Sequence, residues 1–571
     1  MDRIKAIERA WIRDRALSGE ILDDVVRSTY SYALRLASSC ALPVQRTHGA
    51  IEYVDITPHT NELRSELESI MSSIGSAVTY PVTPKALSGI GILAPCGKWH
   101  RATLVAHYPA VAKHLRTAIG RLFRAYPCID ESSIERELRQ KALVLALGGG
   151  GGTGYAHVCL FRWLEECGIA PELITGTSFG AIAGYLRSLQ TNYDAAMTML
   201  KLPGYWKFIR NLHPCIGTGT HGLMGICRID FDALCEILWR SAGYSRPPAF
   251  GELKIPFAAV ATGILATSHL AAEIEPKTPL RSLTGVLRLT QLSWRKAMHH
   301  AAQIANLIVK QGDGVEPVVF GFDDQTRAMC AIDGVAFSAL IPGVINAEIP
   351  ASHTRSRAIV DDLFNRRALY RLADGGLTSN VPARAAHDEV QNGRIRTRNT
   401  WILGIDVFAP QARDGVFYPL QQIANDNVCA DARFADTVVR LKDLLSPMEL
   451  SPSLPRMHWL NNKFRKAFDA EMKVVQYATA PLLPLHALDL IGFDGPSFSL
   501  GAPYLAALNT GFCRPISPVG LNTGSGYAYF AALNTAPLVR YFARWAQYAH
   551  VGPHPRPVGR EVRRKFIFFL L

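Results

Sequence analysis

Residues 141–187 read KALVLALGGGGGTGYAHVCLFRWLEECGIAPELITGTSFGAIAGYLR, and this stretch decides the fold. The wholly apolar run Ala142–Leu147 is typical of a strand that is buried on both faces of a parallel sheet. A glycine-rich turn and a helical segment follow it, and a second short strand is predicted at Glu172–Thr175. This second strand leads directly into GTSFG and a helix of small residues. The alternation of strands and helices predicts an α/β fold.

Two features of this stretch carry chemistry. The turn Gly176-Thr177-Ser178-Phe179-Gly180, between a strand and a helix, has the G-x-S-x-G pattern of a nucleophile elbow. Glycine at both flanks permits a turn too tight for side chains, so that the Ser178 hydroxyl is lifted clear of the backbone. The glycine run before the first helix can turn several N–H groups toward one point, where negative charge is best tolerated. Acyl transfer requires both a nucleophile and such an anion-binding loop.

Each pattern by itself has a plainer interpretation. G-x-S-x-G also arises by chance, as an ordinary turn between a strand and a helix. Gly149, Gly151 and Gly154 satisfy G-x-G-x-x-G, the pattern of a dinucleotide loop, which expects an acid at the end of the next strand. Here that strand ends in the serine turn, and Glu172 stands before it. A dinucleotide-binding oxidoreductase is therefore the third-ranked interpretation.

Taken together, these residues resemble the patatin-like phospholipases. Three motifs occur in the family's order: the glycine loop Gly149, Gly150, Gly151, Gly152, Thr153 and Gly154, the elbow with Gly176 and Gly180, and Asp374-Gly375-Gly376. The sequence GLTSNVPARAA after the aspartate also looks like the family's continuation. Phe250–Ile264 resembles its central strand, and Ala339–Gly343 resembles the segment that precedes its catalytic aspartate. The likeness covers residues 140–267 and 335–410.

The resemblance implies a lipid acyl hydrolase with a Ser178–Asp374 dyad, an oxyanion hole of backbone N–H groups from the glycine loop, and no metal or organic cofactor. It also implies a three-layer α/β domain with a mostly parallel central sheet. One residue departs from the family, because Thr153 stands where a basic residue is usual. This departure motivates a second hypothesis, a catalytically weak membrane- or partner-binding protein on the same scaffold.

Asp374 and the histidines have competing interpretations. A loop aspartate can simply cap a helix, which is the plainer role for Asp374. A Ser-His-Asp triad in the chain order of α/β-hydrolases would use His387, which follows the aspartate. We expect His387 on a helix that begins near Pro382, facing solvent, and we expect His157 to pack or to cap.

The composition of the chain indicates what kind of partner it binds and in which cellular compartment it works. The chain has 571 residues and a net charge of +13, which predicts two or three domains and favours acidic partners. Because the basic residues are scattered, we expect an anionic membrane surface and a phospholipid or other acyl-ester substrate, and no nucleic acid; the need for a protein activator stays open. Eleven cysteines without a C-x-x-C pair favour reduced thiols. No secretory signal or run of about 20 apolar residues is seen, so a cytoplasmic protein with peripheral membrane contact is expected.

The rest of the chain divides into three regions. Residues 1–138 are predicted to be a helical N-terminal region, 139–410 the acyl hydrolase domain with an insertion at about 268–335, and 411–571 a C-terminal region of unknown fold. Within the insertion, Leu280–Gln311 predicts a basic amphipathic helix that either packs on the core or lies at a lipid interface. The basic and then apolar end of the chain, from Arg556 to Leu571, is compatible with a membrane clip, an edge strand or a buried tail. His213, Cys215 and His221 lack the spacing of a zinc site, so no metal is expected there.

Overall fold

The computed structural model describes residues 3–45, 51–75, 90–192, 212–217, 221–223, 225–269, 314–411, 417–447, 449 and 452–489. All of them belong to one compact unit formed by Met1–Ile491 together with Phe569–Leu571. The predicted basic helix at Leu280–Gln311 and the predicted roles of the C-terminal tail lie outside the described residues. Those interpretations therefore stay predictions.

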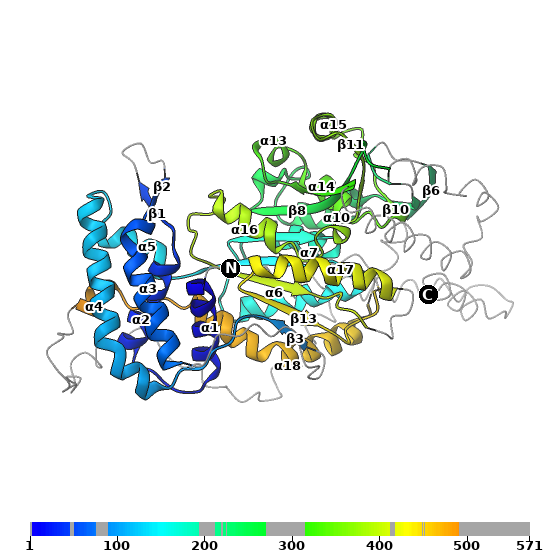
Figure 1. Ribbon diagram of the computed structural model, residues 1–571. Coiled ribbons are helices and arrows are strands. Elements are labelled where there is room, and N and C mark those ends of the chain that lie inside the picture. Colours follow the sequence, from blue (N-terminus) through cyan, green and yellow to red (C-terminus); the bar gives the residue numbers. More distant parts are fainter. Residues whose placement is uncertain are drawn as a thin grey trace. The chain divides into compact units, whose positions relative to one another are not determined.

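The unit is built around an eight-stranded mixed sheet (Figure 1). Its strand order is β11-β8-β5-β4-β12-β13-β3, and β9 also pairs with β8. The strands are β3 (Ile90–Leu93), β4 (Ala142–Leu147), β5 (Leu173–Thr177), β8 (Phe257–Leu265), β9 (Val315–Phe320), β11 (Leu369–Ala373), β12 (Thr400–Asp406) and β13 (Thr437–Leu441). The predicted α/β class and the predicted central strands at β4, β5 and β8 are confirmed.

The centre of the sheet is parallel and its margins are antiparallel. β4 pairs in parallel with both β5 and β12, β5 continues in parallel to β8, and β12 to β13. β3, β9 and β11 are antiparallel to their neighbours. Every residue of β4 and β12 is buried, as expected for parallel strands that helices cover on both faces. The sheet is thus mostly parallel, as the sequence predicts.

One pairing explains how distant parts of the chain meet. Ala259–Ile264 of β8 pair along one edge with β9, so β5 and β11 must both lie on the opposite edge. β5 runs parallel to β8 and reaches Val260, whereas β11 runs antiparallel and reaches Thr262. The two strands therefore approach each other end to end. Their C-terminal ends, which lead into Ser178 and Asp374, meet at the middle of β8.

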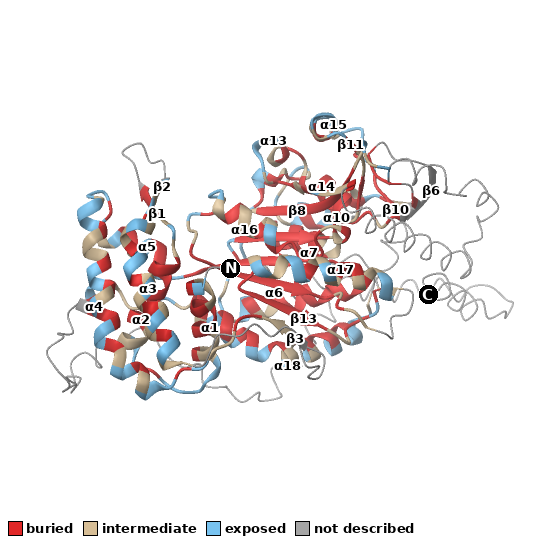
Figure 2. Cartoon of the chain, in the orientation of Figure 1, coloured by how far each residue is buried: buried red, intermediate tan, exposed pale blue. Residues whose placement is uncertain are grey.

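Helices cover both faces of the sheet and complete three layers. One layer includes α18 (Leu454–Thr479), α6 (Ala156–Glu166), α7 (Phe179–Ser188) and α14 (Ala331–Ser338), each of which contacts the next in this order. The other includes α16 (Ala383–Gln391), which packs on β4, β5 and β12. Its alanines and Val390 share a buried apolar cluster with alternate residues of β4. Figure 2 shows the buried residues concentrated along the strands between these layers.

The first 138 residues are mostly helical, as predicted. They form α1 (Arg3–Leu17), α2 (Asp24–Ser38), α3 (Thr57–Ile74), α4 (Arg101–Ala125) and α5 (Glu131–Leu138), with a hairpin of β1 (Ala41–Gln45) and β2 (Ile51–Asp55). The sequence analysis missed that β3 of this region joins the central sheet at β13. The N-cap of α5 is Asp130, whose side chain accepts a hydrogen bond from the Ser133 N–H.

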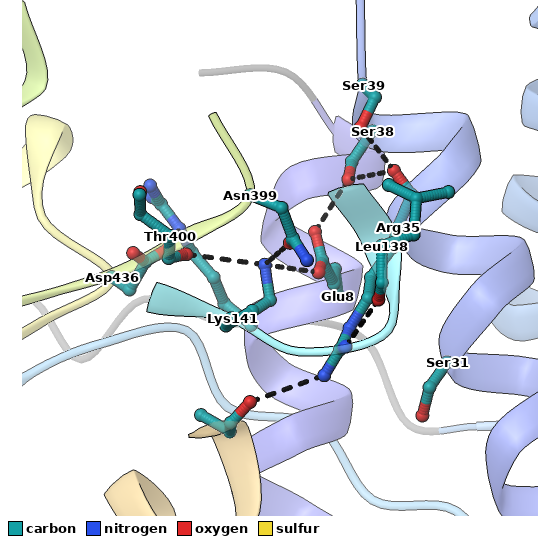
Figure 3. A network of polar contacts seen from close by, with 12 residues as sticks. Glu8, Ser31, Arg35, Ser38, Ser39, Leu138, Lys141, Asn399, Thr400 and Asp436 are labelled. Atoms are coloured by element: carbon teal, nitrogen blue, oxygen red, sulfur yellow. Dashed lines mark hydrogen bonds and ion pairs between the residues drawn. The ribbon is translucent and has the colours of Figure 1, made fainter. Parts of the chain in front are cut away.

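A buried polar network joins the N-terminal helices to the core (Figure 3). Lys141, at the start of β4, lies 2.7 Å from a Glu8 carboxylate oxygen of α1 and donates to Asn399 at 2.8 Å. Ser38 of α2 donates to the other Glu8 oxygen at 2.7 Å. Burial alone would raise the pKa of Glu8, but the charge of Lys141 and these hydrogen bonds lower it below its ordinary value. The carboxylate is therefore held ionised and paired.

The remaining elements lie around this core. A small sheet contains β6 (Leu212–Gly217), β7 (Gly225–Ile229) and β10 (Gly343–Asn346). The other α-helices in the described part of the chain are α10 (Phe231–Ser241), α13 (Asp324–Arg327), α15 (Thr354–Arg367), α17 (Tyr418–Asp431) and α19 (Leu485–Asp489). Among the described helices, none is both long enough and apolar enough to cross a membrane.

Candidate active site

Ser178 occupies a strained turn between β5 and α7. Its φ of 53° and ψ of −124° lie in a region that non-glycine residues rarely adopt. The Ser178 N–H donates to the Ser338 hydroxyl at 2.9 Å, and that hydroxyl donates to the Val260 carbonyl at 2.5 Å. The strained peptide is thereby fixed to β8 through the last residue of α14. This geometry is that of the elbow expected from the sequence.

The elbow glycines are required by close backbone contacts. A Cβ on Gly176 would lie 2.5 Å from the Gly180 carbonyl oxygen, and a Cβ on Gly180 would lie 2.7 Å from the Gly148 carbonyl oxygen. Neither backbone oxygen can move away cheaply. Gly149 is constrained in the same way, because its Cβ would lie 2.8 Å from the Ser178 Cβ. The glycine loop and the serine are therefore in direct van der Waals contact.

The structure places the Ser178 hydroxyl beside the Asp374 carboxylate, close enough for a hydrogen bond from the hydroxyl to lower the pKa of the carboxyl. The carboxylate Oδ1 also accepts the Gly376 N–H at 2.8 Å. Asp374 keeps some contact with solvent, yet protein atoms surround the carboxylate closely. The resulting desolvation raises the pKa of Asp374 to about 6, against the lowering effect of the two hydrogen bonds. A carboxylate with this pKa is a better proton acceptor than an ordinary aspartate and is still mostly ionised at neutral pH.

Asp374 also has the plainer role weighed in the sequence analysis. Its bond to the Gly376 N–H caps a short 3-10 helix, η5 (Gly375–Leu377). The Asp374 carbonyl accepts the Thr262 hydroxyl at 2.8 Å, which ties this turn to β8. A Cβ on Gly375 would lie 2.8 Å from the Val260 carbonyl carbon. The capping bond thus fixes the position of the Asp374 carboxylate. In this position the carboxylate still lies beside the Ser178 hydroxyl.

Most N–H groups of the glycine loop already have partners. Gly148 donates to the Ile405 carbonyl at 2.9 Å, Gly149 to the Asn380 carbonyl at 3.3 Å, and Gly152 to the Pro447 carbonyl at 2.7 Å. Within the described part of the chain, the N–H groups of Gly150 and Gly151 donate to no other group. These residues have φ values of 157° and 58°, which glycine adopts readily. They are the available donors of the loop.

Thr153, which stands in place of the family's basic residue, bonds to another residue of the glycine loop. Its side chain is buried, and its hydroxyl donates to the Gly150 carbonyl at 2.8 Å. The Thr153 N–H reaches the same carbonyl at 3.3 Å. Since a trans peptide directs its C=O and N–H to opposite sides, fixing the Gly150 carbonyl also fixes the direction of the Gly151 N–H.

The two histidines of the rival interpretation lie apart from the Ser178–Asp374 pair. His157 is fully buried, its Nε2 lies 2.8 Å from the Gly148 carbonyl oxygen, and burial lowers its pKa to about 4. The expectation that it packs is confirmed. His387, on α16 as predicted, contacts Asp388 and the Phe434 ring. It is partly buried and not turned fully to solvent.

Sequence reasoning missed two residues that hold the site. Ser338 carried no recognisable signal, because a single serine at the end of an apolar helix is unremarkable. Asn380 was quoted only within the stretch after the aspartate, yet it is buried and its Oδ1 lies 3.2 Å from where a Gly149 Cβ would be. Both act on the site through backbone contacts that only the folded chain creates.

Side chains that could hold a metal lie elsewhere. His221 is bonded to Asp361 at 2.7 Å, and the side chains of His213 and Cys215 lie outside the described residues. Cys330, Asp333 and His353 form one group of close donor atoms, and Glu131, Glu135 and His486 form another. Cavities of about 820 Å³ and 440 Å³ adjoin the first group, and neither is lined by Ser178 or Asp374.

Part of the chain is similar in sequence to known proteins. Residues 145–387 match the family model described as patatin-like phospholipase. Patatin-like phospholipase domain-containing protein 7 of Rattus norvegicus is 45% identical over 65 residues, which are 11% of this chain and 5% of that protein. Lysophospholipase nte1 of Emericella nidulans is 33% identical over 118 residues (19% and 8%), and lysophospholipase NTE1 of Mycosarcoma maydis is 26% identical over 176 residues (29% and 9%). The chain spans less than a tenth of the length of these relatives.

Proposed function

Residues 145–387 form a patatin-like phospholipase domain, and on that premise we propose that the protein is a lipid acyl hydrolase that cleaves fatty-acyl esters through Ser178 and Asp374. The observation that carries the proposal is the juxtaposition of Ser178, in its strained elbow, with the Asp374 carboxylate where β5 and β11 converge on β8. The raised pKa of Asp374, about 6, supports its role as the base. A serine in a strained elbow and a base of matched pKa are the components that covalent ester hydrolysis needs.

In the proposed acylation step, Asp374 accepts the hydroxyl proton while the Ser178 oxygen attacks the ester carbonyl carbon. The Gly376 N–H and the Ser178 hydroxyl hold the carboxylate in place beforehand. Collapse of the tetrahedral intermediate then returns the proton to the alcohol that leaves. The product of this step is a fatty-acyl ester of Ser178.

The N–H groups of Gly150 and Gly151 are the proposed oxyanion donors. Two features support this role. Among the described residues they have no other acceptor, and they stand at the start of the 3-10 turn η1 (Gly151–Tyr155), which leads into α6; N–H groups at such a start favour negative charge. Removal of one such donor costs on the order of 100- to 1000-fold in rate in other acyl-transfer enzymes. Water, deprotonated by Asp374, then hydrolyses the acyl-enzyme.

A phospholipid or lysophospholipid is the proposed substrate class. It is supported by the family and by relatives whose names include lysophospholipase. The net charge of +13 supports action at an anionic membrane surface, because scattered cationic charge attracts the protein to anionic lipid.

The test combines a covalent probe with a substrate panel. A fluorophosphonate should label the purified chain on Ser178, and Ser178→Ala should lose both the label and the release of fatty acid. Ser65→Ala, at an exposed position of α3, is the matched control and should keep both. Labelling and hydrolysis that persist in Ser178→Ala would overturn the proposal.

The second candidate is a weakly catalytic binding protein on the same scaffold, favoured by Thr153 at the family's basic position. This candidate predicts lipid hydrolysis by the wild type no faster than by Ser178→Ala, together with tight binding to anionic vesicles. Hydrolysis well above that variant, under the same conditions, excludes it.

A further inference from the structure

A cluster of three different metal-ligand types lies between α10, α14 and α15, away from the acyl hydrolase site. Cys330 precedes α14, Asp333 lies in its first turn, and His353 precedes α15. Their donor atoms all lie within 4.8 Å of one another. His353 Nδ1 is 3.0 Å from both oxygens of Asp333, and both side chains are less than 10% exposed.

We propose that Cys330, Asp333 and His353 bind a zinc ion. Thiolate, imidazole and carboxylate are its usual ligands, at about 2.0 to 2.3 Å in a tetrahedron whose edges are then about 3.3 to 3.8 Å. The Asp333–His353 pair is already near that spacing, and the thiolate needs to move by about 1 Å at most. Binding displaces the thiol proton and any proton held between His353 and Asp333. A thiolate donor disfavours Mg²⁺ and Ca²⁺, which prefer oxygen.

The other side of the His353 ring supports this assignment. Its Nε2 lies 3.7 Å from an oxygen of Asp232 on α10. Histidines that bind a metal through one ring nitrogen usually donate the other N–H to a carboxylate, which orients the ring. A side-chain movement of about 1 Å would bring Asp232 within hydrogen-bonding distance of Nε2, while Nδ1 faces Asp333. An ion pair of His353 alone would need either Asp333 or Asp232, whereas a metal site uses one carboxylate as a ligand and the other to orient the ring.

The cluster also has access and room for a fourth ligand. A cavity of about 820 Å³ is lined by Cys330, His353 and Asp232, among other residues. A water molecule from this cavity can complete a tetrahedral site that has three protein ligands. Local spacing patterns in the sequence do not reveal this group of ligands. Here His353 comes from a segment well beyond the other two ligands, and only the fold brings it to them.

The zinc ion would stabilise the helix that supports the elbow. α14 begins next to Cys330 and ends at Ser338, the residue that accepts the Ser178 N–H. Zinc bound at the first turn of α14 would therefore stabilise a helix whose last residue contacts the elbow. The site itself takes no part in ester cleavage, so its test is independent of the proposed function.

Metal binding is tested on the full chain, stripped with a chelator and dialysed. Isothermal titration with Zn²⁺ alone should give one site per chain and raise the melting temperature. Titration with Co²⁺ should give an absorption band from charge transfer between thiolate and cobalt. Cys330→Ser should abolish the band and, like His353→Gln, weaken Zn²⁺ binding at least 10-fold. Asp232→Asn should keep the band and weaken binding about 10- to 100-fold.

Two controls separate this site from other donors. Cys429→Ser, at an exposed cysteine, and His486→Gln, in the carboxylate–histidine group at Glu131 and Glu135, should both bind Zn²⁺ like the wild type. Should a ligand variant fail to fold, protection of Cys330 from iodoacetamide by Zn²⁺ in the wild type, mapped by mass spectrometry, replaces it. No thiolate band, unprotected Cys330, or unchanged affinity in Cys330→Ser would each overturn the proposal and leave an ion-pair cluster.

Discussion

Replacing Asp374 with asparagine should make the protein more stable and inactive at the same time. Desolvation raises the pKa of Asp374 from its ordinary value of 3.8 to about 6. The protonated acid is therefore the form that the fold prefers. Its stabilising effect is fully present below pH 3.8 and is lost as the pH rises through 6. Asparagine stays neutral throughout, and its amide can still accept the Gly376 N–H and contact Ser178.

The size of the effect follows from the two pKa values. The ionised carboxylate costs up to about 3 kcal/mol of folding free energy at neutral pH. Relative to the wild type, Asp374→Asn should gain about 1.5 kcal/mol at pH 5 and reach a plateau near 3 kcal/mol above pH 7. Urea denaturation followed by intrinsic fluorescence measures this difference at each pH. Asp388→Asn, at a more exposed carboxylate of α16, is the control and should show no such pH-dependent gain.

The same carboxylate should shape the rate profile. If Asp374 is the base, kcat/KM of the wild type falls below an apparent pKa of about 6, because protonation removes the proton acceptor. An Asp374→Asn variant that is no more stable than the wild type at pH 7, or whose gain is the same at pH 5 and pH 8, would refute the electrostatic reasoning. A variant that retains hydrolysis would refute the catalytic role.

Three further perturbations test the neighbouring features. Thr153→Val removes the hydroxyl that holds the loop carbonyl and should lower kcat about 10-fold, as expected for one net hydrogen bond; Thr153→Ser should stay within about threefold in the same fatty-acid release assay. His387→Gln should leave hydrolysis within about twofold, and a loss like that of Ser178→Ala would favour a triad instead. Glu8→Gln or Lys141→Met alone should destabilise the fold by about 3–5 kcal/mol in urea denaturation, because each leaves a buried charge unpaired, and the double variant should recover most of that loss. Additive losses in the double variant would contradict the ion-pair account.

Local patterns were sufficient for the central part of the fold. The apolar run at Ala142–Leu147 predicted a buried parallel strand, because only such strands are apolar at every position. The elbow was predictable because the G-x-S-x-G pattern follows a predicted strand, and because the contact that requires Gly176 lies within the turn itself. The edge strands of the sheet were not predictable. β3 is a short segment far from the core motifs, and nothing in four residues indicates that it pairs with β13.

The sequence alone determined which chemical groups the protein offers: a serine in a turn that must be tight, a loop rich in glycine, and an aspartate followed by two glycines. The tertiary structure decided that these groups meet. β5 and β11 share one edge of β8 from opposite directions, so Ser178 and Asp374 come together although they are remote in the chain. It also decided the pKa of Asp374, because desolvation depends on surrounding atoms that many segments supply.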